Sequence, residues 1–181
     1  MRADCDQQPE IHRHRAVIRR SDFSLPLKCV LRDNLLDRGG SLFDYGCGYG
    51  DDIRRLQGLG FDCDGWDPMH RPDVPPRAAD AVNLGYVLNV IEDVQERAQT
   101  LRDAWQLCSK VLVVAARIAV GDGGEFGAEY GDRVLRASPI RGPLGAKRGL
   151  GQTLVAEGFC VRRSEVQPAH AGGVVHLLSR V

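Results

Sequence analysis

The sequence lacks the features of a membrane-spanning, secreted or strongly nucleic-acid-binding protein. It contains no apolar run of about 18 residues, the length that a transmembrane helix requires, and its N-terminus is polar, unlike a signal peptide. The 24 basic and 24 acidic side chains balance, so the chain has no net charge that would attract nucleic acid or a lipid surface. These absences predict a cytoplasmic protein with no membrane partner.

Closely paired cysteines are also missing. The six cysteines form no Cys-x-x-Cys pair, and several lie in apolar segments, as expected for reduced, buried thiols. The sequence therefore predicts no zinc site and no other metal site. Its 181 residues are the length of one domain, which we place at 24–181. A basic segment at 1–23 precedes it and is a candidate lid.

The turn at residues 41–50 carries the strongest functional signal. An apolar strand ends at Phe43, Asp44 follows, and every second residue from Gly46 to Gly50 is glycine. Glycine is needed where a ligand approaches the main chain closely, because a side chain would block it. The pattern predicts a nucleotide-type binding loop that leads into a helix, with a plain strand-to-helix turn as the alternative.

A second carboxylate, Asp67, comes seventeen residues after Gly50. In dinucleotide-type folds, a carboxylate about 20 residues past the glycines accepts hydrogen bonds from ribose hydroxyls at the end of the second strand. Residues 51–60 have helical spacing and 61–66 are typical of a strand, which fits that arrangement. The alternative is that Asp67 and Pro68 form only a turn.

The loop resembles the first motif of the class I S-adenosylmethionine-dependent methyltransferases, in which an acidic residue precedes Gly-x-Gly-x-Gly. A loop that binds a pyrophosphate usually has Gly-x-Gly-x-x-Gly, whereas here the third glycine comes one position early. Asp51 and Asp52 follow it and would repel a pyrophosphate, but they tolerate a sulfonium and an ammonium. S-adenosyl-L-methionine is therefore the predicted cofactor, with NAD as the alternative.

The order of elements predicts an α/β fold, Rossmann-like, with a doubly wound, mostly parallel sheet and a C-terminal antiparallel strand pair. Ser24 is a plausible helix start, and Gly39-Gly40 a stop. Strands are expected at 41–45, 61–66, 81–84, 111–115, 159–166 and 174–179, and further helices at 93–107 and 149–158.

The region after the second strand is expected to be shortened. Only twelve residues separate Asp67 from Asp80, and three prolines lie within 70–77, which excludes a regular helix there. A strand and its helix are usual at this point of the fold, and residues there would hold the adenine ring. Met69, His70 or Arg71 are the candidates to replace them.

The segment from Asp80 to Asp93 is predicted to lie at the reaction centre. In class I methyltransferases the loop after this strand separates the cofactor's methyl group from the acceptor. Asn83 to Tyr86 is faintly similar to the Asn/Asp-Pro-Pro-Tyr motif of amino-directed DNA methyltransferases, although both prolines are absent. Tyr86 and Asn89 are the candidate substrate-side residues. In the alternative interpretation Asn83 and Asn89 brace a turn while Tyr86 packs on the sheet.

Residues from His12 to Arg117 together resemble a more particular family, the methyltransferase domain of the DNA phosphorothioation-associated putative methyltransferases. The matching strings include Asp44-Tyr-Gly-Cys-Gly-x-Gly50-Asp-Asp, Gly65-Trp-Asp-Pro68 and the segment 82–93. The resemblance implies the fold and the cofactor. Its predicted cofactor-binding residues are Asp44, Tyr45, Gly46, Cys47, Gly48, Gly50, Trp66, Asp67, Pro68, Asn83, Leu84 and Gly85.

The basic N-terminal segment has two interpretations. It can fold over the cofactor pocket and grip an acidic substrate, or it is a solvated charge run. His14 lies within it and is a candidate general base, because an unperturbed histidine titrates near pH 6.5. No carboxylate–histidine pair is evident that would identify a base with more certainty.

The predicted function is methyl transfer from S-adenosylmethionine to a small-molecule acceptor, because the chain is short, neutral and without an evident target-recognition domain. A methyltransferase of DNA or RNA is the first alternative. It would require a basic face, formed by Arg13, Arg15, Arg19, Arg20, Arg141, Lys147 and Arg148. The second alternative is a non-catalytic cofactor-binding subunit of a larger complex.

Overall fold

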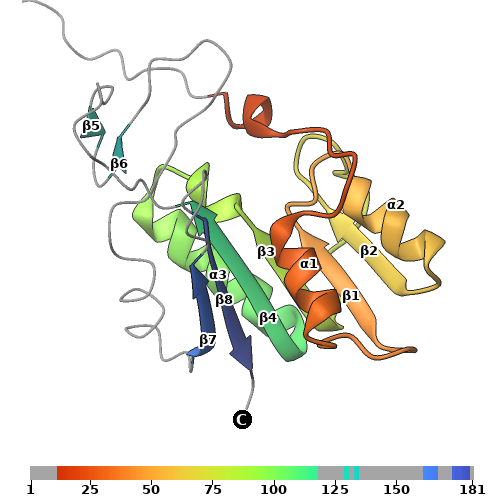
Figure 1. The fold of residues 1–181 in the computed structure, drawn as a ribbon. Coiled ribbons are helices and arrows are strands. Elements are labelled where there is room, and N and C mark those ends of the chain that lie inside the picture. Colours follow the sequence, from red (N-terminus) through yellow and green to blue (C-terminus); the bar gives the residue numbers. More distant parts are fainter. Residues whose placement is uncertain (1–11, 118–128, 131–132, 135–160, 167–172, 180–181) are drawn as a thin grey trace, which may run out of the picture.

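The computed structural model of the protein describes residues 12–117, 129–130, 133–134, 161–166 and 173–179. Its elements are η1 (Arg13–Ala16), α1 (Leu25–Arg32), β1 (Ser41–Tyr45), α2 (Asp51–Gly58), β2 (Asp62–Trp66), β3 (Ala79–Gly85), η2 (Val87–Asn89), α3 (Val94–Leu107), β4 (Cys108–Arg117), β5 (Glu129–Tyr130), β6 (Arg133–Val134), β7 (Val161–Val166) and β8 (Gly173–Ser179), shown in Figure 1. The helix predicted at 149–158 lies outside the described residues.

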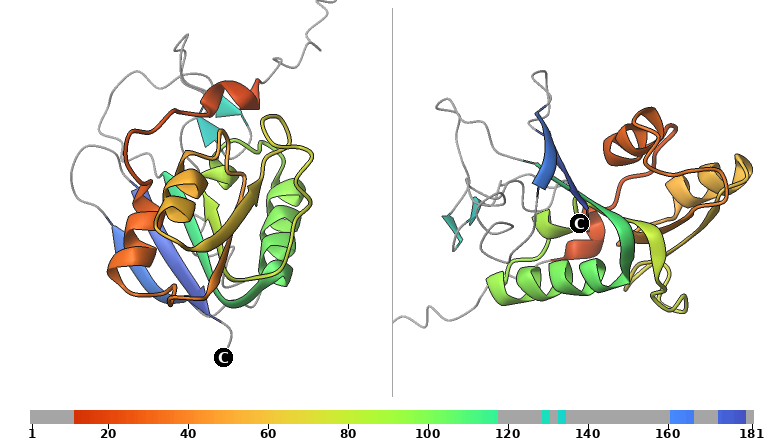
Figure 2. Two further views of the ribbon diagram at one scale, coloured as in Figure 1. Left: turned by 90° about the vertical axis from the view of Figure 1, so that its right-hand side faces the viewer. Right: turned by 90° about the horizontal axis from the view of Figure 1, so that it is seen from below.

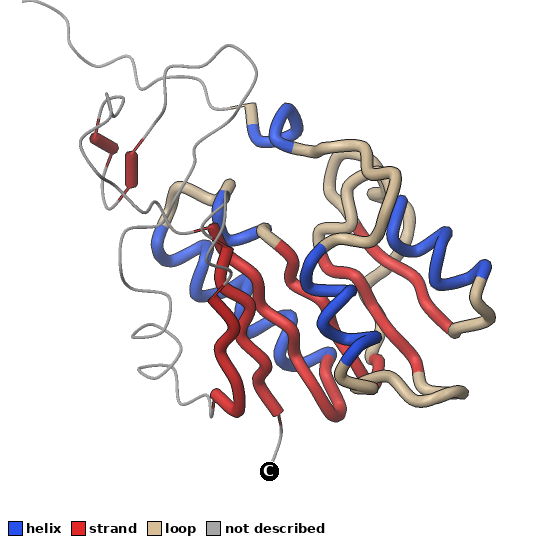
Figure 3. The backbone as a smooth tube through the Cα atoms, viewed as in Figure 1, coloured by secondary structure: helices blue, strands red, loops and turns tan. Residues whose placement is uncertain are grey.

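The main sheet has the strand order β2-β1-β3-β4-β8-β7. β2, β1, β3 and β4 are parallel, and β8 runs antiparallel to both β4 and β7. Figure 3 shows these strands side by side, with helices on both faces. β5 and β6 form a separate two-stranded pair. The prediction of a mostly parallel α/β sheet is confirmed.

Helices cover the two faces of the sheet and create two apolar cores. α1 and α2 pack on one face and α3 on the other, as Figure 2 shows. Alternate residues of β4 serve the two cores: Val113 faces α1 and α2, whereas Leu112 and Val114 face α3. This alternation follows from the two-residue period of a strand, and burial on both faces explains the continuous apolar run of β4.

The chain passes from β2 to β3 without an intervening helix or strand, as the sequence predicts. Within residues 67–78, a single bridge joins Asp67 and Arg71. β2 is consequently the edge strand of the sheet, and β1 lies between β2 and β3. Asp67 is thus followed by turns and not by a further strand and helix.

The first helix is shorter than predicted. α1 begins after Ser24 as expected but ends at Arg32, well before Gly39 and Gly40. The cause is Asn34, whose φ of 51° is left-handed and ends the helix. Leu35 then turns back and donates its amide to the carbonyl of Val30, 3.0 Å away.

The sheet register brings Asp44, Gly65 and Asn83 into one row. Asp44 of β1 is paired with Gly65 of β2 on one side and with Asn83 of β3 on the other. Side chains at paired positions of neighbouring strands point to the same face. The row lies near the carboxyl ends of these strands, the edge where ligands bind in open α/β sheets.

We expect Gly65→Ala to lower the free energy of unfolding by about 1–3 kcal/mol, the usual cost of overpacking. A Cβ at this position would lie 2.7 Å from the carbonyl oxygen of Asp44 and 2.5 Å from Cδ1 of Ile53. Chemical denaturation measures the effect. The matched control is Gly58→Ala, where nothing lies within 4 Å of the added Cβ. Equal stability changes in the two variants would contradict this account.

Candidate functional site

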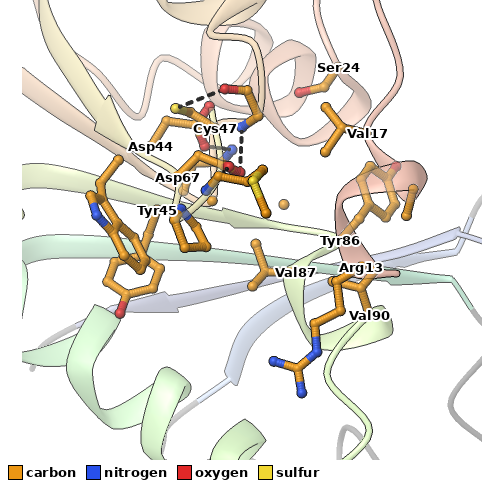
Figure 4. Close-up of a pocket in the computed structure, with 18 of the residues that line it drawn as sticks. Arg13, Val17, Ser24, Asp44, Tyr45, Cys47, Asp67, Tyr86, Val87 and Val90 are labelled. Carbon is orange, nitrogen blue, oxygen red and sulfur yellow. Dashed lines mark hydrogen bonds between the residues drawn. The ribbon is translucent and has the colours of Figure 1, made fainter. Parts of the chain in front are cut away.

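A cavity of about 630 Å³ opens at the carboxyl ends of β1, β2 and β3. It is closed on one side by residues of the N-terminal segment, and η1 lies above these strand ends in Figure 1. Figure 4 labels ten of the lining residues, with Asp44, Cys47 and Ser24 toward the top of the view and Arg13 and Val90 toward the bottom. Ten predicted cofactor-binding residues line it: Asp44, Tyr45, Gly46, Cys47, Gly48, Trp66, Asp67, Pro68, Asn83 and Gly85.

Three of the predicted site residues, Leu84, Gly50 and Asn89, are not among the described residues that line the cavity. Leu84 is fully buried in the core beside α3, because the strand alternation points it away from the face that carries Asn83. Gly50 instead packs against Arg71, whose Nη1 lies 2.8 Å from where a Cβ would be. Asn89 is buried within η2. His14 belongs to η1, and its side chain lies outside the described part.

The glycine loop is fixed by hydrogen bonds to the end of β2. The amides of Gly46 and Cys47 donate to the carbonyl of Trp66 over 2.8 and 3.1 Å. Gly46 has a φ of 86°, and a Cβ there would collide with Cγ2 of Val87. Glycine is therefore required by both the backbone conformation and the close approach of η2.

Asp67 ties the glycine loop to the turn that follows β2. Its Oδ2 accepts the amide of Gly48 at 3.0 Å, while its Oδ1 accepts the amides of Met69 and His70 at 3.0 and 2.9 Å. Nδ1 of His70 is also 3.0 Å from Oδ1. Burial opposes ionisation, but the hydrogen bonds from His70, Met69 and Gly48 outweigh it and lower the pKa of Asp67. Since a carboxylate oxygen accepts about two hydrogen bonds, Oδ2 can take one more donor.

Asp44 and Asn83 form a buried polar pair inside the cavity. The exposed fractions of the two residues are 5% and 3%, and Nδ2 of Asn83 donates to Oδ1 of Asp44 over 2.7 Å. Burial raises the pKa of Asp44 to about 7; the bond from Asn83 opposes the shift, and the negative charges of Asp52 and Asp67 add to it. Oδ1 of Asn83 is buried without a hydrogen-bond partner.

This pair is complementary to a cation that can donate hydrogen bonds. A buried acceptor without a partner costs about 1–3 kcal/mol, and a bound ammonium would satisfy Oδ1 of Asn83. It would also favour the ionised form of Asp44, because an opposite charge nearby lowers a carboxyl pKa. An anion at this position would meet repulsion instead. The electrostatics agree with the preference for a cationic ligand inferred from the sequence.

The basic N-terminal segment is held by acidic partners. Arg13 forms ion pairs with Glu92 and Glu96 over 2.6 and 2.5 Å. The hydrogen bond to Glu96 contributes most to raising the pKa of this guanidinium, despite some burial. Arg19 pairs with Asp51 at 3.2 Å and lies 3.9 Å from the ring centroid of Tyr49. Charge complementarity thus positions the segment across the cavity.

The remainder of the cavity is mostly apolar. Tyr86 marks its boundary, with a φ of 66° that is rare for a residue other than glycine and typical of functional sites. No sequence motif marks the other lining residues of this part, and none of them was predicted as a site residue. They are Ala16, Val17, Ile18, Val87, Val90, Ile91, Glu96 and Thr100. Three of them, Val87, Val90 and Ile91, come shortly after the end of β3 in the sequence, which is the one sequence feature that could have indicated them.

The described part of the chain has neither a cluster of metal ligands nor a helix suited to a membrane. No three histidine, cysteine, aspartate or glutamate side chains there gather as metal ligands would. None of the described helices has the length and apolar character needed to cross a bilayer.

Comparison with known proteins shows the fold. No protein-family model and no curated protein matches the sequence. A Burkholderia thailandensis 1,6-didemethyltoxoflavin-N1-methyltransferase, solved with S-adenosylhomocysteine, is 15% identical over 87% of this chain and 77% of its own, with a TM-score of 0.61. The glycopeptide N-methyltransferase MtfA, also with S-adenosylhomocysteine, is 11% identical (86% and 89% covered, TM-score 0.64). The CcbJ methyltransferase from Streptomyces caelestis is 13% identical (84% and 88% covered, TM-score 0.61).

These likenesses show that the chain has the Rossmann-like fold of these methyltransferases. The strand order and the polar row of Asp44 and Asn83 are consistent with that fold. The narrower resemblance to the phosphorothioation-associated proteins finds no support in the comparisons.

We expect the stability of the protein to depend on pH through Asp44. Its carboxyl group ionises near pH 4 in the unfolded chain but only near pH 7 in the folded protein. Between these values the folded state holds a proton that the unfolded state has released, so stability falls as pH rises, by at most about 1.4 kcal/mol per pH unit. Asp44→Asn removes this slope.

Chemical denaturation gives the free energy of unfolding of Asp44→Asn and of the wild type at each pH. The value for the variant minus that for the wild type should rise from pH 4 to pH 7 and then level off. Asp73→Asn, at an exposed position, is the control and should show a constant difference. If the difference for Asp44→Asn also stayed constant with pH, the carboxyl group of Asp44 would have the same pKa in the folded and unfolded states, contrary to this prediction.

Proposed function

We propose that this protein is an S-adenosylmethionine-dependent methyltransferase that acts on a small-molecule acceptor. The observation that carries the proposal is the buried pair of Asp44 and Asn83 at the carboxyl edge of the sheet, with an amide oxygen that lacks a partner. Together with Asp67, which holds Gly48 in the glycine loop, it provides separate places for an ammonium and for a ribose.

The described residues fit the polar groups of this cofactor. The ammonium of its amino-acid end would bind Oδ1 of Asn83 and the carboxylate of Asp44, both of which lie in the cavity. A ribose hydroxyl would donate to Oδ2 of Asp67, which has one protein donor, the amide of Gly48.

Met69 is the best of the three candidates for contact with the adenine. It lines the cavity and yet is 61% exposed, so a ligand could cover it. His70 is engaged with Asp67 over 3.0 Å, and Arg71 with Asp64 over 2.9 Å. Those two side chains support the turn around Asp67 and are not available to the base.

The cofactor would supply an electrophilic methyl group on a sulfonium sulfur, which the acceptor displaces in line. The protein's contribution is to position the reactants and to exclude water. Tyr86 and Val87 follow the strand that carries Asn83, and line the cavity where the acceptor must approach. Glu96, the carboxylate of this region, is paired with Arg13. The described lining therefore favours an acceptor that arrives already nucleophilic.

Two observations support a small-molecule acceptor over DNA or RNA. Two of the similar structures are methyltransferases of a toxoflavin precursor and of a glycopeptide. In addition, Arg13 and Arg19, which the nucleic-acid hypothesis requires on a free basic face, are neutralised by carboxylates. Three other members of that face, at positions 141, 147 and 148, lie outside the described residues.

Calorimetric titration with S-adenosylmethionine and S-adenosylhomocysteine tests the cofactor. We expect binding by the wild type and a loss of roughly 10- to 100-fold in Asp67→Asn, the cost of removing a hydrogen bond to a charged group. Asp73→Asn, an exposed position in the same connection, should bind as the wild type does. Absence of binding by the wild type at millimolar ligand would refute the proposal.

Turnover separates an enzyme from a binding subunit. The protein should transfer a labelled methyl group from S-adenosylmethionine to at least one member of a panel of small amines, phenols and thiols, with release of S-adenosylhomocysteine. Double-stranded DNA and RNA should remain unlabelled. Transfer to nucleic acid, with a rate that falls steeply as salt rises, would instead favour the nucleic-acid alternative.

A further inference from the structure

Ser24 is a buried residue of the cavity wall whose hydroxyl has no function in the fold. It is 5% exposed and lines the cavity, and its Oγ has no hydrogen-bond partner. Serine at the N-cap of a helix normally accepts an amide of the first turn, but the side chain of Ser24 makes no such bond to α1. Its backbone amide instead donates to Asp52 over 3.1 Å. The residue is held in place while its hydroxyl points to no protein group.

Arg20 is a second polar residue of the same wall. Its backbone is fixed at both ends, since its amide donates to Asp51 over 2.9 Å and its carbonyl accepts from Arg55. Its guanidinium lies 5.9 Å from the ring centroid of Tyr86 and lines the cavity. Among the ion pairs of the described residues, those of Arg13 and Arg19 take up carboxylates, whereas the side chain of Arg20 has none.

These two residues adjoin the pair of Asp44 and Asn83. A Cβ at Gly85 would lie 3.0 Å from Nδ2 of Asn83 and 3.3 Å from Cγ of Pro26, so the start of α1 lies next to Asn83. The charge of Arg20 is close enough to lower the pKa of Asp44, against the larger effect of burial.

One end of the cavity therefore offers both kinds of polar partner. Asp44 and Oδ1 of Asn83 suit a cationic donor, whereas the guanidinium of Arg20 and the hydroxyl of Ser24 can donate to an anion. A lone ammonium would leave Arg20 and Ser24 without partners, and a lone carboxylate would be repelled by Asp44. An α-amino acid group has an ammonium and a carboxylate attached to the same carbon. It can therefore provide partners for all four side chains.

We propose that Arg20 and Ser24 bind the carboxylate of the cofactor's amino-acid end, so that the N-terminal segment distinguishes the intact cofactor from nucleosides that lack this group. The inference rests on the proposed function and adds two binding residues from outside the glycine loop and the strand ends. The backbone amides of Arg20 and Ser24 are themselves held by Asp51 and Asp52, so binding of the carboxylate by the two side chains also fixes this part of the chain over the cavity.

The test compares two ligands that differ in the carboxylate alone. S-adenosylmethionine and decarboxylated S-adenosylmethionine share the sulfonium, the ribose, the adenine and the ammonium. By calorimetry, Arg20→Gln should weaken binding of S-adenosylmethionine roughly 10- to 100-fold, and Ser24→Ala roughly 3- to 10-fold. Neither variant should change binding of decarboxylated S-adenosylmethionine by more than about twofold, because this ligand has no carboxylate for Arg20 or Ser24 to bind.

Arg15→Gln and Ser21→Ala are the matched controls, because both positions are exposed on the same segment, and both variants should bind the two ligands as the wild type does. Thermal unfolding should be unchanged in Ser24→Ala, since no capping bond is lost. Equal weakening of both ligands in Arg20→Gln would overturn the carboxylate assignment and indicate a structural role. Absence of binding of either ligand to the wild type would instead contradict the proposed function itself.

Discussion

The hydrogen bond between Asn83 and Asp44 is the interaction on which the site depends. It links β1 and β3 through two buried polar side chains, and the parallel register decides which residues meet there. A one-residue shift in the register of either strand would turn its member of the pair to the face of α3 and so separate the two side chains. Gly65 completes the row, because its missing side chain leaves room for the carbonyl of Asp44 and for α2. The sheet thus holds a costly polar pair in a fixed geometry.

Acidic side chains organise the N-terminal segment around that pair. Glu92 and Glu96 hold Arg13, Asp51 holds Arg19, and Asp52 holds the amide of Ser24. Exposed ion pairs each contribute little stability, but these are distributed along the segment and determine its path. Although the charges of the whole chain balance, they are ordered locally: a basic segment lies on acidic residues of α2, of α3 and of the loop before α3.

The sequence predicted the parts of the molecule that short-range patterns specify. Strand 41–45 and helix 93–107 were placed within one residue, since an apolar run and a capping aspartate, Asp93, mark them. The glycine loop and Asp67 were found because one loop needs them at fixed spacing. Ser24 and the apolar lining from Val17 to Ile91 were missed, because they meet the motif residues only through tertiary packing. Leu84 was included because it lies within the motif, but a motif match does not tell which face a side chain takes, and the side chain of Leu84 faces α3.

The shortened connection after β2 determines where recognition must be concentrated. Without a further strand and helix, the side of the cavity beyond Asp67 is bounded by the exposed Met69, and contacts made in water contribute less than buried ones. The opposite end is formed by Asp44, Asn83 and Ser24, all nearly inaccessible to solvent. Hydrogen bonds and charges act most strongly there. For the proposed cofactor, this predicts selection mainly through its amino-acid end, which residues of the N-terminal segment close.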